Sequence, residues 1–409
     1  MWGNSFILKI AEQEKRMENF DIKKAPFVKK AVSVEGFVFM LGFAAFFAVV
    51  GGIMGGVNML NTIMLTAYEL LIGTVFYIMA VAIIAGAIAE LFVEFGVVSA
   101  TNKMLSGAVR IIYGMPGASI VGIFATYFSD NPAILTLADN EKFKAYFKKY
   151  QMPALTNVGT SFGMGLIVSA FIAGIVSPTG ETFILPLIIG NIGAFIGSIV
   201  SVRLMLLYTV RLFGKTQEAV TEAGMEFDFI NLRIVREGSP PNRFMEALLE
   251  GGKRGVGMGL AIAPGVLVIC TLILILTNGA SSSGAYTGAA FEGIGFIPAI
   301  GERLSFIIDP LFGFSDPKAI AVPLTAIGAS GAAIGLIPGL VADGVAGPRD
   351  IAVFVAMCMC WSGYMSTHIA MMENLGFRSL AGKAILCHTV AGLCAGISAN
   401  IIYGLYMLV

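Results

Sequence analysis

The chain has 409 residues, of which 57% are hydrophobic and only 13% are charged, and its mean hydropathy is +0.85. A soluble domain carries about 25% charged residues, so this composition is typical of an all-α protein that crosses a membrane several times. The 26 basic and 26 acidic residues cancel, which argues against nucleic acid as a partner.

Residues 1–32 alternate apolar positions with seven Lys or Arg and lack a signal-peptide pattern. They predict an amphipathic segment on the cytoplasmic surface of the membrane. We expect a first span and its loop over 33–66, the span itself at about 36–58.

A second span is expected at about 67–95, and it carries Glu90 near its end. This carboxylate predicts either a proton relay or an ion pair; the ion pair is favoured, and Arg110 and Arg203 are the candidate partners. Residues 96–113 have helical periodicity but are short and charged, which favours a helix at the membrane interface over a span.

The stretch 114–139 is apolar at both ends but broken in the middle by polar residues and a proline: Ser129, Asp130, Asn131 and Pro132. Each apolar arm is too short to cross a bilayer, which needs about 20 residues, and proline cannot continue a helix. The pattern predicts a re-entrant helical hairpin whose polar tip lies at mid-membrane. A kinked spanning helix or a surface loop are the alternatives.

Spans are expected next at about 153–176 and 183–213, followed by an extended polar loop over 214–255. A further span at about 257–277 leads into a loop that contains no charged residue from Asn278 to Ala290.

The second half repeats the order of the first. Residues 295–312 form another amphipathic stretch, and 313–343 is broken at Gly328–Gly331. Gly96 precedes Gly114 by the same distance as Gly295 precedes Gly313. Spans at about 350–372 and 383–408 complete about seven full spans and two hairpins.

Lys and Arg concentrate in the N-terminal segment, in 96–150 and in the 214–255 loop, which places these segments inside. Counting crossings from a cytoplasmic N-terminus then gives the two repeats, 67–213 and 256–409, opposite orientations. Inverted repeats of this kind place the substrate of a secondary transporter between discontinuous elements at the midplane.

This order of elements resembles the concentrative nucleoside transporter fold and its relatives, the nucleoside-recognition or gate membrane proteins. Four stretches carry the resemblance: Leu105 to Ala118, Phe128 to Ile134, Asn242 to Ala247 with Gly251, Gly255 and Gly259, and Trp361 to His368 with Glu373 to Gly376. The resemblance implies a transport fold and a homotrimer. It covers about 67–405.

The sequence departs from the family where the family contacts its nucleoside. The first tip of the family supplies Gln and Glu, whereas the matching positions here are Phe128 and Asp130. The second hairpin carries Asn-Glu-Phe-Val in the family, but here its tip, Gly328 to Gly331, has no acid. The resemblance therefore implies the scaffold and leaves nucleoside specificity open. The gate relatives also include part of a ferrous-iron permease.

The candidate site residues are the polar side chains of the expected tips and helix faces. A carboxylate at bilayer depth is usually functional, which makes Asp130 the leading candidate, although it could instead cap the second half-helix. The full set expected at the substrate is Ser129, Asp130, Asn131, Thr156, Asn157, Ser330, Ser362, Ser366 and Thr367.

A small cation such as Na⁺ is expected to bind oxygen atoms of Asn131, Asn157, Thr160 and Ser161. Hydroxyls that bond back to their own helix are an equally common explanation. The two histidines, His368 and His388, suggest a metal pair or one satisfied polar residue per helix, and the second interpretation is favoured. The methionines of 357–372 and the five cysteines indicate packing.

No phosphate loop, zinc signature or nucleophile elbow occurs, so we expect neither an enzyme nor a cofactor. The expected function is symport of a small polar, nucleoside- or base-like solute with Na⁺ or H⁺ across the inner (plasma) membrane. A membrane assembly subunit without transport activity and a metal-ion permease are the alternatives.

Overall fold

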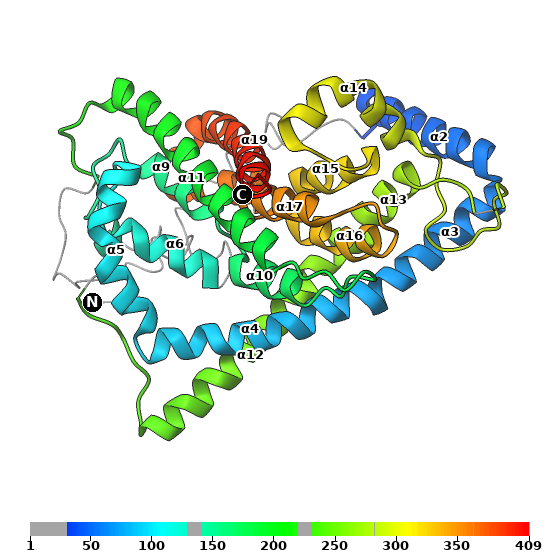
Figure 1. Cartoon of the computed structure of the whole chain (residues 1–409). Helices are drawn as coiled ribbons and strands as arrows, with labels where there is room; N and C mark the ends of the chain where they lie inside the picture. Colours follow the sequence, from blue (N-terminus) through cyan, green and yellow to red (C-terminus); the bar gives the residue numbers. More distant parts are fainter. Residues whose placement is uncertain (1–30, 129–140, 220–230, 282, 363, 409) are drawn as a thin grey trace, which may run out of the picture. The chain divides into compact units, whose positions relative to one another are not determined.

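The computed structural model describes residues 31–128, 141–219, 231–281, 283–362 and 364–408, and they form helices without a named strand (Figure 1). The chain divides into two compact units, Met1–Gly56 and Val57–Val409. The first unit contains α2, Val34–Met54, whose N-terminus is capped by the Ser33 hydroxyl, and the helix ends at Gly55 with a φ of 83°. The sequence thus predicted this span within two to four residues.

Among the described residues, six helical stretches are long and apolar enough to cross a membrane, which confirms a multi-pass, all-α protein. They are Val34–Met54, Gly56–Glu94, Met152–Ala173, Ile184–Phe213, Pro240–Thr277 and Arg378–Tyr406. The remaining expected span, 350–372, is divided into two shorter helices, described below.

Two of these stretches are much longer than expected. The first runs through α3 (Gly56–Glu69), a π-helical turn η2 (Leu70–Val75) and α4 (Phe76–Glu94). The second runs through α12 (Pro240–Pro264), the π-helical turn η3 (Gly265–Cys270) and α13 (Thr271–Thr277). Their lengths of 39 and 38 residues correspond to almost 60 Å of helix, about twice the thickness of a bilayer core.

The loop expected at the end of the 33–66 segment is therefore wrong, because residues 56–66 are helical. Two of their polar side chains find partners in the 278–295 loop: Thr66 accepts a hydrogen bond from the Phe291 N–H at 2.8 Å, and Asn58 donates to the Tyr286 carbonyl at 3.0 Å. These tertiary contacts satisfy polar groups that the sequence alone assigned to a loop.

The polar loop expected over 214–255 is likewise wrong beyond residue 239, where α12 begins with Pro240 at its first position. Three of the charged residues of this helix, Arg243, Glu250 and Arg254, form ion pairs with α4 or with one another. The pairing offsets part of the cost of placing these charges against a neighbouring helix.

The two interfacial helices confirm the expected repeat. α5 (Val97–Tyr113) and α14 (Phe296–Phe312) each have 17 residues. Left-handed glycines flank both helices, Gly96 and Gly114 around α5 and Gly295 and Gly313 around α14. The positive φ at these positions explains why the spacing recurs as glycine, since other residues are strained there.

The second broken stretch forms a helical hairpin. The short turn η4 (Pro317–Ile320) leads into α15 (Ala321–Gly328), Ala329 has an extended backbone, and α16 (Ser330–Ala342) packs back against α15. The predicted break at 328–331 is thus confirmed. Of the stretch 114–139, where the sequence predicts the first hairpin, α6 (Ser119–Phe128) is described, while the predicted tip and second arm lie outside the described residues.

Each helix that follows a hairpin is interrupted. The first is divided into α9 (Met152–Thr160) and α10 (Gly165–Ala173), and the second into α17 (Pro348–Cys360) and α18 (Tyr364–Asn374). The expected spans at 153–176 and 350–372 are therefore each two helices with a break between them.

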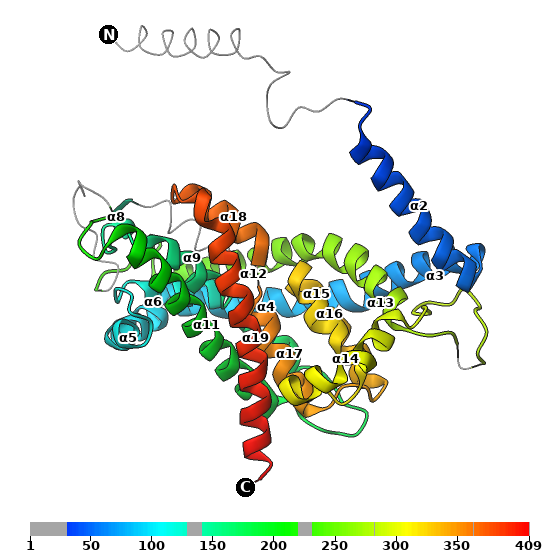
Figure 2. The same ribbon diagram turned by 90° about the horizontal axis from the view of Figure 1, so that it is seen from above.

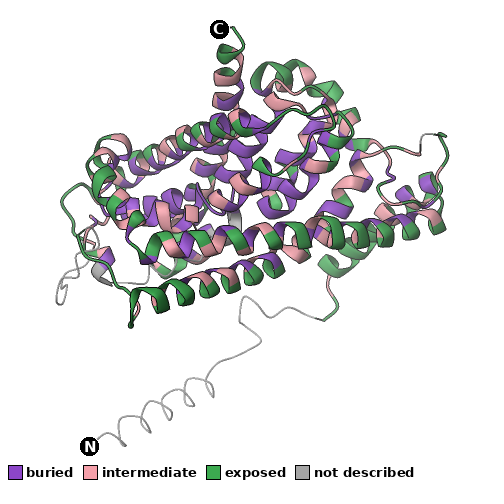
Figure 3. Ribbon diagram, turned by 60° about the horizontal axis from the view of Figure 1, so that its bottom comes forward, coloured by how far each residue is buried: buried purple, intermediate pink, exposed green. Residues whose placement is uncertain are grey.

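The helix that follows each interrupted pair is long and continuous: α11 (Ile184–Phe213) and α19 (Ala381–Tyr406), which pack side by side with α17 (Figure 2). Short turns complete the described chain: α8 (Glu141–Lys144) and η5 (Arg378–Leu380). α17 is buried along nearly its whole length, whereas buried and exposed residues alternate along the longest helices (Figure 3).

The antiparallel helices α4 and α12 approach closely because their facing positions are glycine or alanine. A Cβ added at Gly86 would come 2.6 Å from the Gly251 carbonyl oxygen, and one at Gly255 would come 2.5 Å from the Ala82 carbonyl carbon. Both contacts are with backbone, which cannot move aside as a side chain can. Small residues of this kind allow helices to pack tightly in lipid.

We therefore expect Gly255→Leu to destabilise the protein by up to about 3 kcal/mol, the cost of overpacking a close contact. The measurement is the loss of helical circular dichroism in graded denaturant, with the protein in detergent. Gly257→Leu is the matched control, because a Cβ at Gly257 meets nothing within 4 Å. Equal stability of the two variants would contradict the close packing described here.

Candidate functional site

Three helix breaks lie close together in the second unit: the one between α9 and α10, the one between α17 and α18, and the tip of the second hairpin. A Cβ at Gly331 of the tip would come 3.5 Å from the Met164 side chain, and the Ser161 hydroxyl contacts the Cys360 thiol. Met164 has a φ of 55°, a strained value for a residue other than glycine. Strained backbone of this kind persists where the surrounding structure enforces it, often at functional sites.

Asn157 lies fully buried on α9, close to this break. Its amide Nδ2 donates to Ser201 Oγ of α11 at 2.8 Å and to the Ala384 carbonyl of α19 at 2.9 Å. Because a carbonyl can only accept, the Ala384 contact fixes which end of the side chain is the NH₂ group. The remaining atom, Asn157 Oδ1, has no hydrogen-bond partner within the described residues.

The neighbouring hydroxyls on α9 bond back to their own helix. Thr160 Oγ1 donates to the Thr156 carbonyl at 2.8 Å, and Ser161 Oγ donates to the Asn157 carbonyl at 2.7 Å. Thr156 Oγ1 lies 3.3 Å from the Met372 sulfur. These hydroxyls therefore bond back to their own helix, while Asn157 Oδ1 faces no donor among the described residues.

The two histidines, twenty residues apart in the chain, stand together in the fold with ring centroids 4.7 Å apart. His388 Nδ1 lies 2.8 Å from Ser201 Oγ and its Nε2 lies 2.5 Å from the Cys360 carbonyl, while His368 Nε2 lies 3.3 Å from Thr160 Oγ1. The fourth ring nitrogen, His368 Nδ1, faces the Tyr364 carbonyl. Each of the four ring nitrogens therefore has a protein group as its partner.

Within the described part of the chain, no three His, Cys, Asp or Glu side chains could hold a metal together. The favoured interpretation of satisfied polar histidines therefore agrees with the contacts. Sequence reasoning missed Ser201, which links Asn157 to His388 from the middle of the apolar helix α11. Its signal in the sequence was a polar residue in a largely apolar helix that also contains Ser198 and Arg203.

The other predicted residues fall into two groups. Ser330 begins α16, where its hydroxyl lies 3.4 Å from the Ala326 carbonyl, and Ser362 is buried at the break after α17. The remaining positions lie outside what the structure describes: the residues Ser129, Asp130 and Asn131, and the side chains of Ser366 and Thr367.

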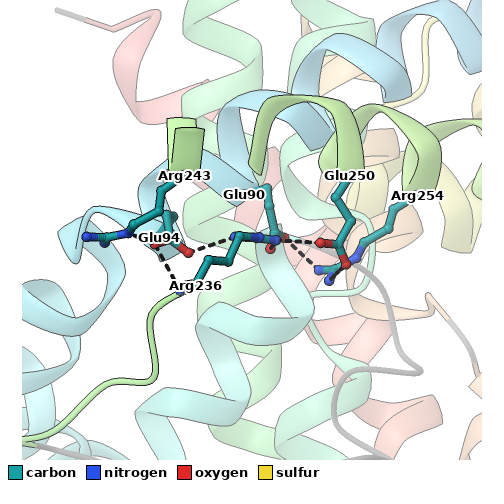
Figure 4. Close-up of polar contacts among 6 residues, drawn as sticks. All are labelled: Glu90, Glu94, Arg236, Arg243, Glu250 and Arg254. Carbon is teal, nitrogen blue, oxygen red and sulfur yellow. Dashed lines mark hydrogen bonds and ion pairs between the residues drawn. The ribbon is translucent and has the colours of Figure 1, made fainter. Parts of the chain in front are cut away.

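An ion-pair network joins α4, α12 and the segment 231–239 (Figure 4). Arg236 donates to Glu90 at 2.6 Å, to Glu94 at 2.7 Å and to Glu250 at 2.7 Å. Contact with Glu250, then with Glu90 and Glu94, raises the pKa of Arg236 despite its partial burial, so it stays charged. A single residue of an extended segment thus ties together three carboxylates from two helices.

Two further arginines complete the network, Arg254 on Glu90 at 2.6 Å and Arg243 on Glu94 at 2.7 Å. Glu90 therefore forms ion pairs, as favoured from the sequence, but with partners other than the candidates Arg110 and Arg203. Arg203 instead donates to the carbonyls of Ile111 and Ile112 at the end of α5.

The fold is found among solved transporter structures. CNTnw in an inward-facing substrate-bound state matches with a TM-score of 0.51 and 14% identity over 90% of this chain and 85% of that one. A CNTnw variant in an outward-facing state matches with a TM-score of 0.50 and 15% identity over 91% and 85%. No protein-family model matches the sequence, and no curated protein matches it either. The agreement extends over about nine tenths of the chain, so this protein has the concentrative nucleoside transporter fold.

Proposed function

We propose that this multi-pass membrane protein is a secondary active transporter of a small polar organic solute, nucleoside- or base-like, driven by Na⁺ or H⁺. The observation that carries the proposal is the convergence of three helix breaks beside buried polar side chains. Unwound backbone is tolerated at membrane depth where it is buried in protein or lines a cavity, and transporters use it to bind solutes and ions.

The solute would lie between the tips of the two hairpins and the breaks after α9 and α17. Its expected contacts are the predicted residues of those segments, with Asp130 as the charged member. Movement of the hairpin-bearing part against α4 and α12 would then expose this place alternately to the two sides.

The coupling cation would bind at Asn157 Oδ1, supported by the hydroxyl oxygens of Thr160 and Ser161 and by Asn131. A buried amide oxygen without a donor is a rare and costly arrangement, and a cation would satisfy it. Oxygen atoms are the ligands that hard cations prefer.

The decisive experiment is uptake of uridine, adenosine and their bases into proteoliposomes under imposed Na⁺ or proton gradients. We expect one of the two gradients to accelerate uptake at least about tenfold. Co-purification with a partner protein and no thermal shift with any solute would instead favour an assembly subunit. A thermal shift with Fe²⁺ or Zn²⁺ alone would favour a metal permease.

Replacing Asn157 by Leu removes the free amide oxygen and is expected to abolish the dependence of uptake on the driving cation. The control is Asn191→Leu, which also removes a hydrogen-bonded amide, in contact with Ser169 and the Leu187 carbonyl, but away from the proposed cation site. Initial uptake rates at varied cation concentration give the readout. Unchanged cation dependence in Asn157→Leu would rule out this residue as a ligand.

The orientation and assembly follow from the same proposal. The Lys- and Arg-rich segments support a cytoplasmic location of the N-terminus and of the 214–255 region. The inner (plasma) membrane is the location proposed for the protein. A homotrimer is what the family resemblance implies.

A further inference from the structure

An apolar cavity of about 370 Å³ lies apart from the central breaks, between α4 and α12 on one side and α5 and α6 on the other. The segment 232–234 contributes three further lining residues. Fourteen of the nineteen lining residues are aliphatic, aromatic or glycine, among them Val93, Val121 and Phe124. Such a lining favours a hydrocarbon chain over a hydrophilic solute, because apolar surface is buried without loss of hydrogen bonds to water.

The charged groups at this cavity leave one arginine in excess. Glu90 lines the cavity and pairs with Arg236 and Arg254, each at 2.6 Å. The network to which these residues belong contains three carboxylates and three arginines, so it is neutral as a whole (Figure 4). Arg233 also lines the cavity, its guanidinium lies against Gly96 at the start of α5, and it pairs with no acid in the part of the chain that the structure describes. An anionic group therefore complements the charge of the cavity.

The residues beside Arg233 are apolar and exposed. Leu232, Ile234 and Val235 are 55%, 81% and 42% exposed in a segment that is not helical. The adjoining helix α5 exposes Met104 by 81% and contains one lysine and one arginine but no acidic residue. Exposed apolar side chains interspersed with basic ones are typical of segments that lie in the headgroup layer of a membrane.

Two other occupants match these observations less well. Free phosphate complements Arg233 but gains nothing from the apolar lining. The amphipathic segment 1–30 of this chain could bury apolar side chains, but it carries seven basic and only four acidic residues, so its net charge has the same sign as Arg233. A ligand that joins a hydrocarbon chain to an anionic group satisfies both requirements.

We propose that this cavity binds an anionic phospholipid, with one acyl chain between α4 and α6 and the phosphate at Arg233. Basic pockets between membrane helices bind the headgroups of anionic lipids in this way. The hydroxyl of Ser99, which also lines the cavity, offers the phosphate a second donor. The inference goes beyond the proposed transport activity, because binding of a lipid requires neither a solute nor a gradient.

Native mass spectrometry of the purified, delipidated full chain tests the lipid preference. Phosphatidylglycerol should bind at least about fivefold more tightly than phosphatidylcholine with the same acyl chains, the effect expected of one basic residue on an anionic headgroup. Arg233→Gln should remove this preference. Arg303→Gln is the matched control and should keep it, because Arg303 is an exposed arginine on the other interfacial helix, α14. Equal binding of both lipids by the wild type, or an unchanged preference in Arg233→Gln, would overturn the proposal.

Thiol protection tests the position of the lipid. Ser99 lines the cavity, whereas its neighbour Ala100 is exposed and does not. Relative to phosphatidylcholine, phosphatidylglycerol should slow alkylation of Ser99→Cys at least about fivefold, following the same difference in affinity, and leave Ala100→Cys unchanged. Ala125→Leu fills the cavity from α6 without changing a charge and should abolish the protection. Protection that persists in Ala125→Leu would refute the placement of the acyl chain.

Glycerol 3-phosphate and inorganic phosphate are the comparison probes in the same assay. They carry the anionic group without the hydrocarbon chain, so neither should protect Ser99→Cys. Protection by either of them as strong as that by phosphatidylglycerol would show that an anion alone binds here, and the lipid would be rejected.

These outcomes are independent of the transport proposal. A preference for phosphatidylglycerol that is lost in Arg233→Gln supports the lipid site whether or not vesicles accumulate solute. Gradient-driven uptake by a protein without this preference refutes the lipid site and leaves the central site unaffected.

Discussion

Replacing Arg236 by Met should destabilise the protein by about 3 kcal/mol. The substitution leaves Glu90, Glu94 and Glu250 with only two arginines, and breaking a buried ion pair typically costs about 3–5 kcal/mol. The lower end of this range applies because Arg254 and Arg243 still contact Glu90 and Glu94. Denaturant titration of the purified protein in detergent measures the effect.

Two variants sharpen this test. Arg378→Met breaks an exposed pair with Glu373, whose side chains are 71% and 53% exposed, and should cost less than about 1 kcal/mol. Adding Glu90→Gln to Arg236→Met removes the excess negative charge and should recover part of the lost stability. If Arg236→Met is as stable as Arg378→Met, the network does not hold the 231–239 segment against α4.

The second large effect is expected from Asp130→Asn, which should abolish gradient-driven uptake while the protein still folds. The sequence predicts Asp130 at a hairpin tip at mid-membrane, where a carboxylate costs a few kcal/mol, and this cost favours a bound cation or solute as its partner. The amide keeps the size of the side chain but removes the charge, so binding should fail without loss of packing. Uptake into proteoliposomes measures the loss of binding and transport, and a thermal melt shows whether the packing of the variant is preserved.

The matched control for this substitution is Asp343→Asn, since Asp343 is an exposed acid that follows the second hairpin. Its uptake should equal that of the wild type. Wild-type uptake by Asp130→Asn would mean that this carboxylate has no part in the transport step.

Local chemistry explains what could be predicted from the sequence. The left-handed backbone at positions 96, 114, 295 and 313 favours glycine. The separation of Gly96 from Gly114 therefore equals that of Gly295 from Gly313, and this recurrence indicates the repeat from the sequence. The break near Ala329 was likewise visible, because a run of small residues interrupts two short apolar arms. In both cases the cause lies within a few residues of its effect.

The long helices and the contacts of the site could not be predicted because their causes are distant in sequence. Thr66 stays helical through a bond to Phe291, and the charges of α12 are satisfied by Glu90 and Glu94 on α4. Asn157 meets Ser201 only because α9 and α11 pack together. A single sequence shows which face of a helix is polar, but not which face of another helix it will meet.

The π-helical turns η2 and η3 have a mechanical consequence. They interrupt the two longest helices of the protein where these lie against each other, and the second also packs on α16 of the hairpin. A π turn has a wider, less favourable hydrogen-bond pattern than the α-helix around it. Each long helix will therefore bend mainly at its π-helical turn, and the α-helical parts on either side of the turn will move as stiff units.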